Sequence, residues 1–220
     1  MKLHYLAILS VLALPVAYGN AISFVGDLGT DATFLPPFPS PYVDSDYAQF
    51  AAVVYTFNVA TNSAMKAITF SYGGGVNGAG QTIAEGGFEP YLSLFDASGN
   101  FLASTFFGTT CPSGANTNSS SGFCYDVELD GGTLAAGDYQ IAISAFENMS
   151  YAENLDSGTL ADGFTGLGNL GSGEDLHYAF DVILTPNINP VPEPTTEGLL
   201  GGALLALVWT RRAKARRVGS

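Results

Sequence analysis

The stretch YLSLFDASGNFLAS, residues Tyr91–Ser104, decides the fold class of this chain. Apolar and polar residues alternate over 91–96, which places successive side chains on opposite faces of a β-strand. A second strand-like run begins at Phe101. The residues that join the two runs, Asp96–Asn100, are rich in turn formers. The stretch therefore predicts a β-hairpin.

The same pattern extends through the body of the chain on both sides of this hairpin. Short runs rich in Val, Ile, Tyr, Phe and Thr are separated by clusters of Gly, Asn, Asp and Ser, and no segment shows a helical period with capping residues. We therefore predict an all-β fold, a β-sandwich or jelly roll of about eight antiparallel strands. The expected strands are 22–27, 48–59, 66–72, 91–96, 101–107, 124–129, 138–146 and 176–184.

Charge is distributed unevenly along the 220 residues, which carry 7 Lys and Arg against 20 Asp and Glu, a formal net charge of −13. Of the acidic residues, 18 lie between Asp27 and Asp181, where the single cation is Lys66. Such a surface repels nucleic acid and anionic lipid, so no nucleic-acid partner is expected.

Residues 1–21 predict a secretory signal peptide, which would form an N-terminal signal helix. Lys2 precedes an apolar core, and small residues follow with two suitable cleavage points, after Gly19 or after Ala21. Export to an oxidising compartment suits the two cysteines, Cys111 and Cys124, for which we predict a disulfide bond. Their spacing lacks a nearby His for a zinc site and is not a CxxC redox motif.

The C-terminal region predicts a membrane anchor. A domain at 22–185 would be followed by a linker at 186–197, a transmembrane helix at 198–210 and a basic cytoplasmic tail at 211–220. The 16 residues between Pro194 and Arg211 span about 24 Å as a helix, less than the ~30 Å hydrocarbon core. Long basic side chains that reach the interface can make up this deficit, and the positive-inside rule places the basic stop in the cytoplasm. This basic stop consists of Arg211, Arg212, Lys214, Arg216 and Arg217.

This tail resembles a known sorting signal. Val191-Pro192-Glu193-Pro194, the apolar run and the basic stop are similar in content and order to the PEP-CTERM signal of Gram-negative bacteria. The resemblance implies an exosortase-type processing enzyme as partner and transient anchoring in the inner membrane. It further implies release to the cell surface or extracellular matrix, in association with exopolysaccharide or biofilm.

Part of the body resembles bacterial pre-peptidase C-terminal (PPC-like) domains. Those β-sandwiches carry a DxxGxxL pattern on one hairpin and an aGxYxlxv pattern on another, and they are accessory modules, so the resemblance implies no catalytic residues. The matching residues here are Asp96, Gly99, Asn100 and Leu102, followed by Ala136, Gly137, Tyr139, Ile141 and Ile143.

Motifs for enzyme chemistry are absent from the sequence, so we do not expect an enzyme. There is no GxSxG elbow, no HExxH, no phosphate-binding loop and no dinucleotide fingerprint. The one histidine of the body, His177, is interpreted as a satisfied or exposed strand residue. A glycoside hydrolase, which needs two carboxylates that meet in space, is a less favoured alternative because no pair stands out.

Calcium is the one cofactor that the sequence suggests, since Ca²⁺ prefers oxygen ligands from Asp, Asn and loop carbonyls. Three acidic clusters could supply them, although none has EF-hand spacing, and the first could equally be a turn that bonds its own backbone. The candidate ligands are Asp96 with Asn100, Asp156 with Asp162, and Glu174 with Asp175.

Carbohydrate binding would require exposed aromatic rings. The candidates are Tyr42, Tyr47, Phe107 and Tyr125, although aromatic residues in strands usually belong to the core. Asn118 and Asn148 begin N-x-S glycosylation motifs. The sequence thus predicts an exported protein of the cell envelope or matrix with a structural or adhesive role. The alternative is a carbohydrate- or calcium-binding accessory module.

Overall fold

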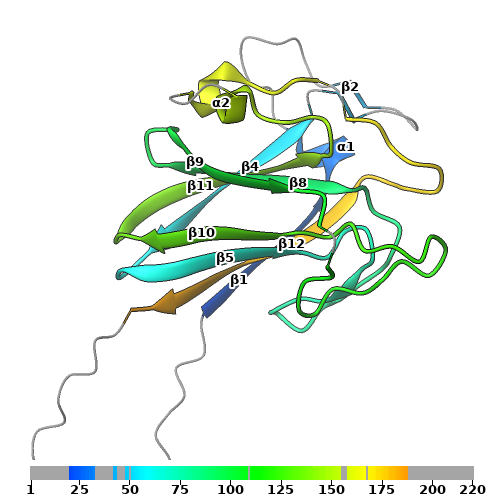
Figure 1. The fold of residues 1–220 in the computed structure, drawn as a ribbon, viewed down its shortest axis with the longest axis horizontal. Helices are drawn as coiled ribbons and strands as arrows, with labels where there is room; N and C mark the ends of the chain where they lie inside the picture. The colour runs from blue at the N-terminus through cyan, green and yellow to red at the C-terminus, as the bar shows by residue number, and fades with distance from the viewer. Residues whose placement is uncertain are drawn as a thin grey trace, which may run out of the picture. The chain divides into compact units, whose positions relative to one another are not determined.

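The computed structural model describes residues 20–32, 42–43, 48–49, 51–108, 110–154, 158–166 and 168–187. This part of the chain is an all-β sandwich of two four-stranded antiparallel sheets, which confirms the predicted fold class (Figure 1). The predicted signal helix up to residue 19, the linker from residue 188, the transmembrane helix and the basic tail lie outside the described residues.

The first sheet, sheet A, has the strand order β1-β12-β5-β10. It contains both ends of the described chain, because the first strand pairs antiparallel with the last and Asn20 lies opposite Leu184. The strands are β1 (Asn20–Asp27), β12 (His177–Pro186), β5 (Ser63–Thr69) and β10 (Glu128–Leu134).

The second sheet, sheet B, has the strand order β4-β11-β8-β9. The predicted hairpin at 91–104 forms its β8–β9 pair, in which Ser93 lies opposite Ser104. Asp96 closes the turn by accepting from the backbone N–H groups of Ser98 and Asn100. The strands are β4 (Ala52–Val59), β11 (Gly137–Ala145), β8 (Pro90–Asp96) and β9 (Phe101–Phe106).

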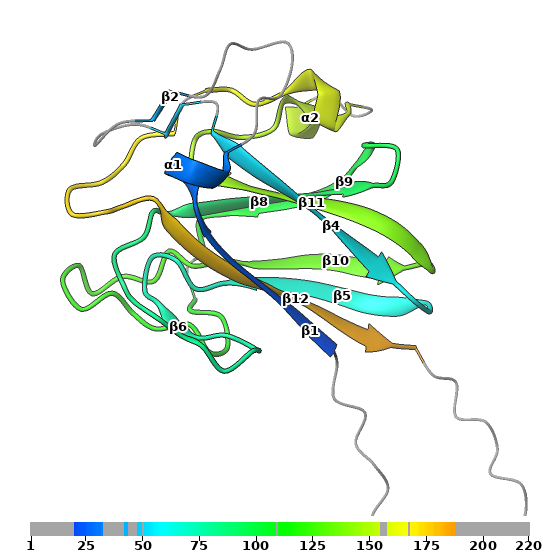
Figure 2. The ribbon, with the colours of Figure 1, turned by 180° about the vertical axis from the view of Figure 1, so that it is seen from behind.

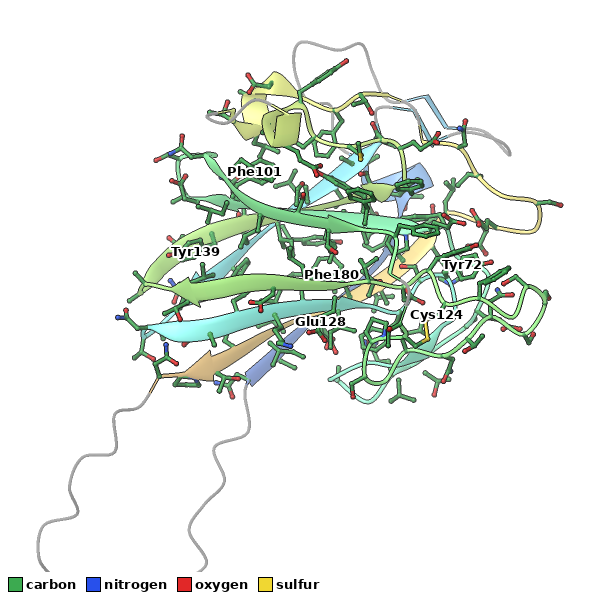
Figure 3. The ribbon with its side chains drawn as sticks, in the orientation of Figure 1. Tyr72, Phe101, Cys124, Glu128, Tyr139 and Phe180 are labelled. Atoms are coloured by element: carbon green, nitrogen blue, oxygen red, sulfur yellow. A yellow bond between two sulfur atoms is a disulfide. The ribbon has the colours of Figure 1, made fainter. Side chains whose placement is uncertain are left out.

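The hydrophobic core lies between the two sheets and follows from the period-two alternation of the strands. Leu92 and Leu94 of β8 and Ile141 and Ile143 of β11 face it from sheet B, and Phe180 faces it from sheet A. Figure 3 shows Phe180 between the sheets. These five side chains are fully buried in the described part of the chain.

Each sheet is also covered in part on its outer face. The connection 146–176 carries α2 (Tyr151–Asn154), which lies over sheet B (Figure 2), and the 3₁₀-helix η1 (Leu160–Asp162). In this layer Ala152 and Phe164 pack on Tyr91 and Phe95. On sheet A, Ala115 and Ile83 pack against Phe70. The remaining short elements are α1 (Leu28–Asp31), β2 (Tyr42–Val43), β3 (Ala48–Gln49), β6 (Gly75–Val76) and β7 (Thr82–Ile83).

The two ends of the sandwich differ in their connections. Because all eight strands alternate in direction, the long connections 28–51, 70–89, 107–127 and 146–176 start and finish at one end, which we call the loop end. The short turns 60–62, 97–100 and 135–136 lie at the other, the turn end. Asn20 and Asn187, where the described chain starts and finishes, also lie at the turn end (Figures 1 and 2).

The predicted strand 48–59 was wrong at its start, because β4 begins at Ala52 and 48–49 belong to β3. The boundaries of two further strands were wrong for a shared reason. The expected strands 66–72 and 124–129 become β5, which ends at Thr69, and β10, which begins at Glu128. Between these ends, Asp126 turns its carboxylate toward the backbone of Ser71 and Gly73. These backbone N–H groups therefore bond to a side chain instead of a neighbouring strand.

Candidate functional site

Aromatic rings from four separate parts of the chain meet at the loop end. Tyr125 lies centrally, with ring centroids 4.8 Å from Tyr72, 5.3 Å from Phe107 and 5.6 Å from Phe123. The row continues through Phe146, whose centroid lies 6.2 Å from that of Phe107, to Phe106 at 5.6 Å. We call these six residues the loop-end aromatic surface.

Three of these rings are unusually open to solvent. Phe106 is 42% exposed, Phe107 51% and Phe123 58%. Phe107, Phe123 and Tyr125 line a hollow of about 420 Å³, whose rim includes both cysteines of the disulfide. Exposed aromatic rings that gather in this way make this surface a candidate binding site.

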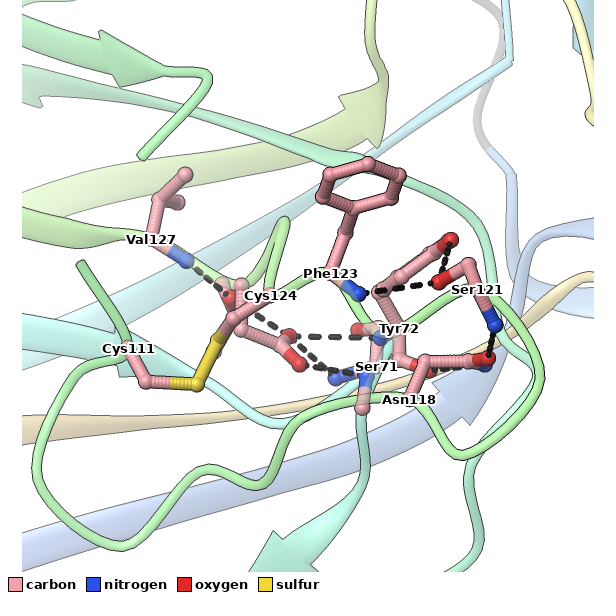
Figure 4. Close-up of a disulfide and its surroundings, with 11 residues drawn as sticks. Ser71, Tyr72, Cys111, Asn118, Ser121, Phe123, Cys124 and Val127 are labelled. Atoms are coloured by element: carbon pink, nitrogen blue, oxygen red, sulfur yellow. Dashed lines mark hydrogen bonds between the residues drawn. A yellow bond between two sulfur atoms is a disulfide. The ribbon is translucent and has the colours of Figure 1, made fainter. Parts of the chain in front are cut away.

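The disulfide closes the loop that carries Phe123. Cys111 and Cys124 are bonded, as predicted, with their Cα atoms 5.4 Å apart. Within this loop the buried Asn118 accepts from the backbone N–H groups of Ser120 and Ser121, each at 3.0 Å. Figure 4 shows the Phe123 ring extending away from the bonded cysteines. The loop is therefore cross-linked internally while its aromatic residue stays exposed.

A buried carboxylate ties this loop to the neighbouring connection 70–89. Asp126 accepts from the backbone N–H groups of Ser71 at 2.6 Å and Gly73 at 2.7 Å, and from the Thr69 hydroxyl at 2.9 Å. Burial raises the pKa of Asp126, and these donors oppose that rise. Because Tyr72 lies between the two bonded amides, Asp126 also fixes the ring against which Tyr125 packs.

The same two connections also bond through their backbones. The Asn116 N–H donates to the Gly74 carbonyl at 3.0 Å, and Gly75 pairs with Ala115 in an isolated bridge. A side chain at Gly73 would place its Cβ 1.8 Å from the Asn116 carbonyl oxygen. The glycine run that begins at residue 73 thus allows two loops to approach closely.

Backbone strain is concentrated at this end of the molecule. Among the described residues, the two non-glycine residues with positive φ are Phe107 at 49° and Glu147 at 70°. Both lie at the loop end, beside Phe146. Strained backbone of this kind occurs preferentially at binding and active sites, since the surrounding structure must hold it in place.

Carboxylates border the loop-end aromatic surface. Glu89, Glu147 and Glu174 line a second hollow of about 290 Å³ together with Phe146. Burial, then the charges of Glu174 and Glu147, raise the pKa of Glu89 to about 7. Burial also raises the pKa of Glu174. The pKa of Tyr125 is also raised, first by burial and then by the carboxylate of Glu89.

The predicted calcium ligands fall into separate places. Asp96 and Asn100 bond each other at 2.8 Å within the turn of the β8–β9 hairpin. Asp162 accepts from the Thr159 N–H beside that turn, where Leu160 donates to the Gly99 carbonyl. In the described parts of the chain, no three His, Cys, Asp or Glu side chains gather as a metal-binding group.

The remaining predicted calcium ligands lie at other places in the structure or outside the described residues. Glu174 accepts from the Gly171 N–H at 2.8 Å, and Asp175 pairs with the ring of His177. Asp156 lies outside the described residues. His177 also contacts the Ala84 carbonyl at 3.1 Å through Nε2, which agrees with its interpretation as a satisfied strand histidine.

Both glycosylation motifs begin with a buried asparagine whose side chain holds other loops. Asn118 donates to the Tyr72 carbonyl at 3.3 Å. Asn148 donates to the Ala51 carbonyl at 3.1 Å and accepts from the Gly166 N–H at 2.8 Å. Both amides have structural roles in the folded chain.

Sequence reasoning found part of the aromatic surface. Phe107 and Tyr125 were candidates for carbohydrate binding, and the structure brings them together, whereas the side chains of Tyr42 and Tyr47 lie outside the described residues. Four further members were missed: Tyr72, Phe106, Phe123 and Phe146. One available signal is that 106 and 146 come at or just after the loop-end termini of strands, where side chains border the long connections.

Comparison with protein-family models, curated proteins and solved structures finds no match to this chain. Its function is therefore inferred from its own residues. None of the helices in the described ranges has the length and apolar content that crossing a membrane requires, and the predicted span at 198–210 lies outside those ranges.

Proposed function

We propose that this chain is an exported protein of the bacterial cell envelope or matrix whose β-sandwich binds exopolysaccharide through the loop-end aromatic surface. The observation that carries the proposal is the row of exposed rings at Phe106, Phe107 and Phe123, at the end of the sandwich where a disulfide and a buried carboxylate cross-link the loops. It acts as an adhesive component, by binding and not by catalysis.

The chemistry of the surface suits a sugar polymer. Sugar rings have apolar C–H faces that pack on aromatic rings, and their hydroxyl groups bond to carboxylates and amides. Both kinds of group lie together here, since Phe146 borders the hollow that contains Glu147 and Asn169. A few polar groups beside an apolar surface are typical of small-molecule and cofactor sites.

The position of the surface suits an anchored protein. The described chain ends at Asn187, at the turn end, and the predicted linker and anchor follow from there. The aromatic surface lies at the opposite end of strands of up to 10 residues, which is roughly 30 Å at the rise of a strand. Figure 3 shows this separation, with Tyr72 and Cys124 at one end and Tyr139 at the other. The predicted linker at 186–197 therefore starts at the end of the sandwich opposite the aromatic surface.

The binding proposal is tested with the full-length chain in mild detergent and exopolysaccharide extracted from its host. We expect the native chain to be retarded in gels that contain the polymer, and Phe123→Ala to bind about tenfold more weakly, as for a central aromatic contact. Leu102→Ala is the matched control, because Leu102 is 45% exposed on β9 but is not part of the aromatic surface. Equal retardation of the native and Phe123→Ala chains would refute the proposal.

The sorting proposal rests on the resemblance of Val191–Pro194, the apolar run and the basic stop to a PEP-CTERM signal. It is tested by the intact mass of the protein recovered from its host, with envelope and medium analysed separately. A mass that ends near Val191–Pro194, found outside the cell, supports processing by an exosortase-type enzyme. A mass that retains Arg211–Arg217 in the inner membrane would contradict it and indicate a permanently tethered domain.

A further inference from the structure

The charge around the loop-end aromatic surface is entirely negative. Glu89, Glu147 and Glu174 share one hollow with Phe146, and Glu85 lines the next hollow together with Tyr72 and Glu174. Between residues 20 and 187 the only Lys or Arg is Lys66, which lies on β5 and pairs with Glu128. No Lys or Arg in this range is therefore available to balance the carboxylates at the loop end.

These carboxylates are bonded to the protein by neutral donors. Glu147 accepts from the Asn169 amide and Glu174 from the Gly171 N–H, each at 2.8 Å. Glu89 is partly buried between them and is destabilised as an anion by both charges. A bound cation would relieve this repulsion, since a nearby opposite charge favours the ionised carboxylates.

Charge also disfavours the other occupants of an exposed aromatic surface. A second copy of the chain, packed symmetrically, would bring the same carboxylates against each other. An anionic polysaccharide or lipid surface would be repelled for the same reason. A neutral glycan could pack on the rings but would leave the charge of the carboxylates unbalanced.

We propose that the loop-end aromatic surface binds a polysaccharide of amino sugars, whose free amino groups are cationic. The C–H faces of the sugars pack on Phe107, Phe123 and Tyr125, while the ammonium groups lie beside Glu89, Glu147 and Glu174. This inference rests on the proposed binding function and assigns its ligand class. The same carboxylates repel acidic polymers, because like charges that meet without a counterion lower the affinity for the wrong ligand.

The test uses two oligosaccharides that differ in one group: a β-1,4-linked glucosamine hexamer and its fully N-acetylated form. Affinities of the full-length chain in mild detergent are measured calorimetrically at pH 6 and low salt. We expect the cationic hexamer to bind about tenfold more tightly, since the partly exposed charge contacts each contribute modestly and a bound ammonium group favours the ionised form of Glu89. The triple variant Glu89→Gln, Glu147→Gln, Glu174→Gln should bring the ratio close to one, because it should lower affinity for the cationic hexamer far more than affinity for the acetylated hexamer.

Two controls separate this site from attraction of a cation to an acidic protein in general. Asp130→Asn and Asp138→Asn together remove two exposed charges from β10 and β11, and should leave the ratio unchanged. Phe123→Ala should weaken the binding of both hexamers. A ratio lowered as much by the two Asp changes as by the three Glu changes would overturn the proposal, because binding would then be diffuse.

The remaining outcomes distinguish this inference from the function on which it rests. Equal affinity of the native chain for the two hexamers, with both lowered by Phe123→Ala, overturns only the amino-sugar inference. Absence of binding to both hexamers and to the host polymer overturns both proposals. A dimer in analytical ultracentrifugation that Phe123→Ala dissociates would also overturn both, because a second copy would then cover the surface.

Discussion

The loop end and the turn end of the sandwich use acidic residues in opposite ways. At the turn end, Asp96 is partly exposed and bonds to its own turn, to Ser98 and Asn100. At the loop end, Asp126 is buried and bonds to a connection more than 50 positions away in the chain. The first stabilises one hairpin locally, whereas the second holds two loops together beneath exposed aromatic rings. Large apolar side chains can thus stay exposed because buried polar groups below them hold the loops.

The largest effect expected from this difference is the loss of Asp126. In Asp126→Ala, the buried backbone N–H groups of residues 71–73 and the Thr69 hydroxyl lose their acceptor. We expect the free energy of unfolding to fall by about 3 kcal/mol, the scale for donors left buried without a partner. Asp96→Ala is the matched change at the turn end and should cost a small fraction of this, because water can reach the donors that the partly exposed carboxylate leaves. Chemical denaturation of both variants measures the difference, and similar losses would contradict the comparison.

The disulfide should have the next largest effect, and it should act on the loop end alone. Replacing Cys111 and Cys124 by Ser opens a loop with a sequence separation of 13, for which the chain-entropy estimate is about 3 kcal/mol. We expect a smaller loss, because Asn118 still bonds the loop internally. Hydrogen exchange should increase over 107–127 and stay unchanged in the β8–β9 turn. Faster exchange at both ends would mean that the ends are coupled.

Backbone strain at Phe107 can be tested by comparing the stability of two variants that both lack the aromatic ring. Phe107 has a φ of 49°, which glycine adopts readily and other residues do not. We expect Phe107→Gly to be about 1 kcal/mol more stable than Phe107→Ala, although neither variant retains the ring that binding requires. Ala136→Gly in the turn between β10 and β11 is the control and should be destabilising, since Ala136 has no positive φ. Equal stability of Phe107→Gly and Phe107→Ala would show that the positive φ at this position is not strained.

The sequence was sufficient where the deciding contacts are local. Alternation over 91–96 and the turn formers after it predicted the β8–β9 hairpin, because both signals lie within one short stretch. The cysteine pairing was predicted for a similar reason, since the chain has no other cysteine to offer. Sandwich architecture followed from the number and spacing of the strands.

The sequence was insufficient where distant residues meet. The ends of β5 and β10 depend on Asp126, whose partners at 69–73 cannot be identified from spacing. The aromatic surface likewise combines Tyr72, Phe107, Tyr125 and Phe146, which come from three long connections. Each of these residues alone is indistinguishable from a core aromatic. Only the topology shows that these connections share one end.

The smallest expected effect is a pH dependence from the loop end. Burial and neighbouring carboxylates raise the pKa of Glu89 from 4.5 to about 7. Between pH 4.5 and pH 7 the carboxyl group of Glu89 is therefore protonated in the folded chain and ionised in the unfolded chain. Stability from this group is therefore full below pH 4.5 and decreases as the pH rises toward 7. Glu89→Gln stays neutral throughout, so it should match the native chain at pH 4. At pH 8 the free energy of unfolding of Glu89→Gln should exceed that of the native chain by about 1 kcal/mol. This value is smaller than the pKa shift alone implies, because Glu89 is half-exposed.

A second variant tests the cause of this shift. Glu147→Gln removes one of the charges that act on Glu89, and should lower the pKa of Glu89 and recover part of the stability difference at pH 8. The titration of the Glu89 carboxyl group can be followed by NMR in the native chain and in this variant. If Glu89 titrated near 4.5 in both, its carboxylate would be stable as an anion in the folded chain. The loop end would then resemble the turn end in this respect, with acidic groups that the solvent accommodates.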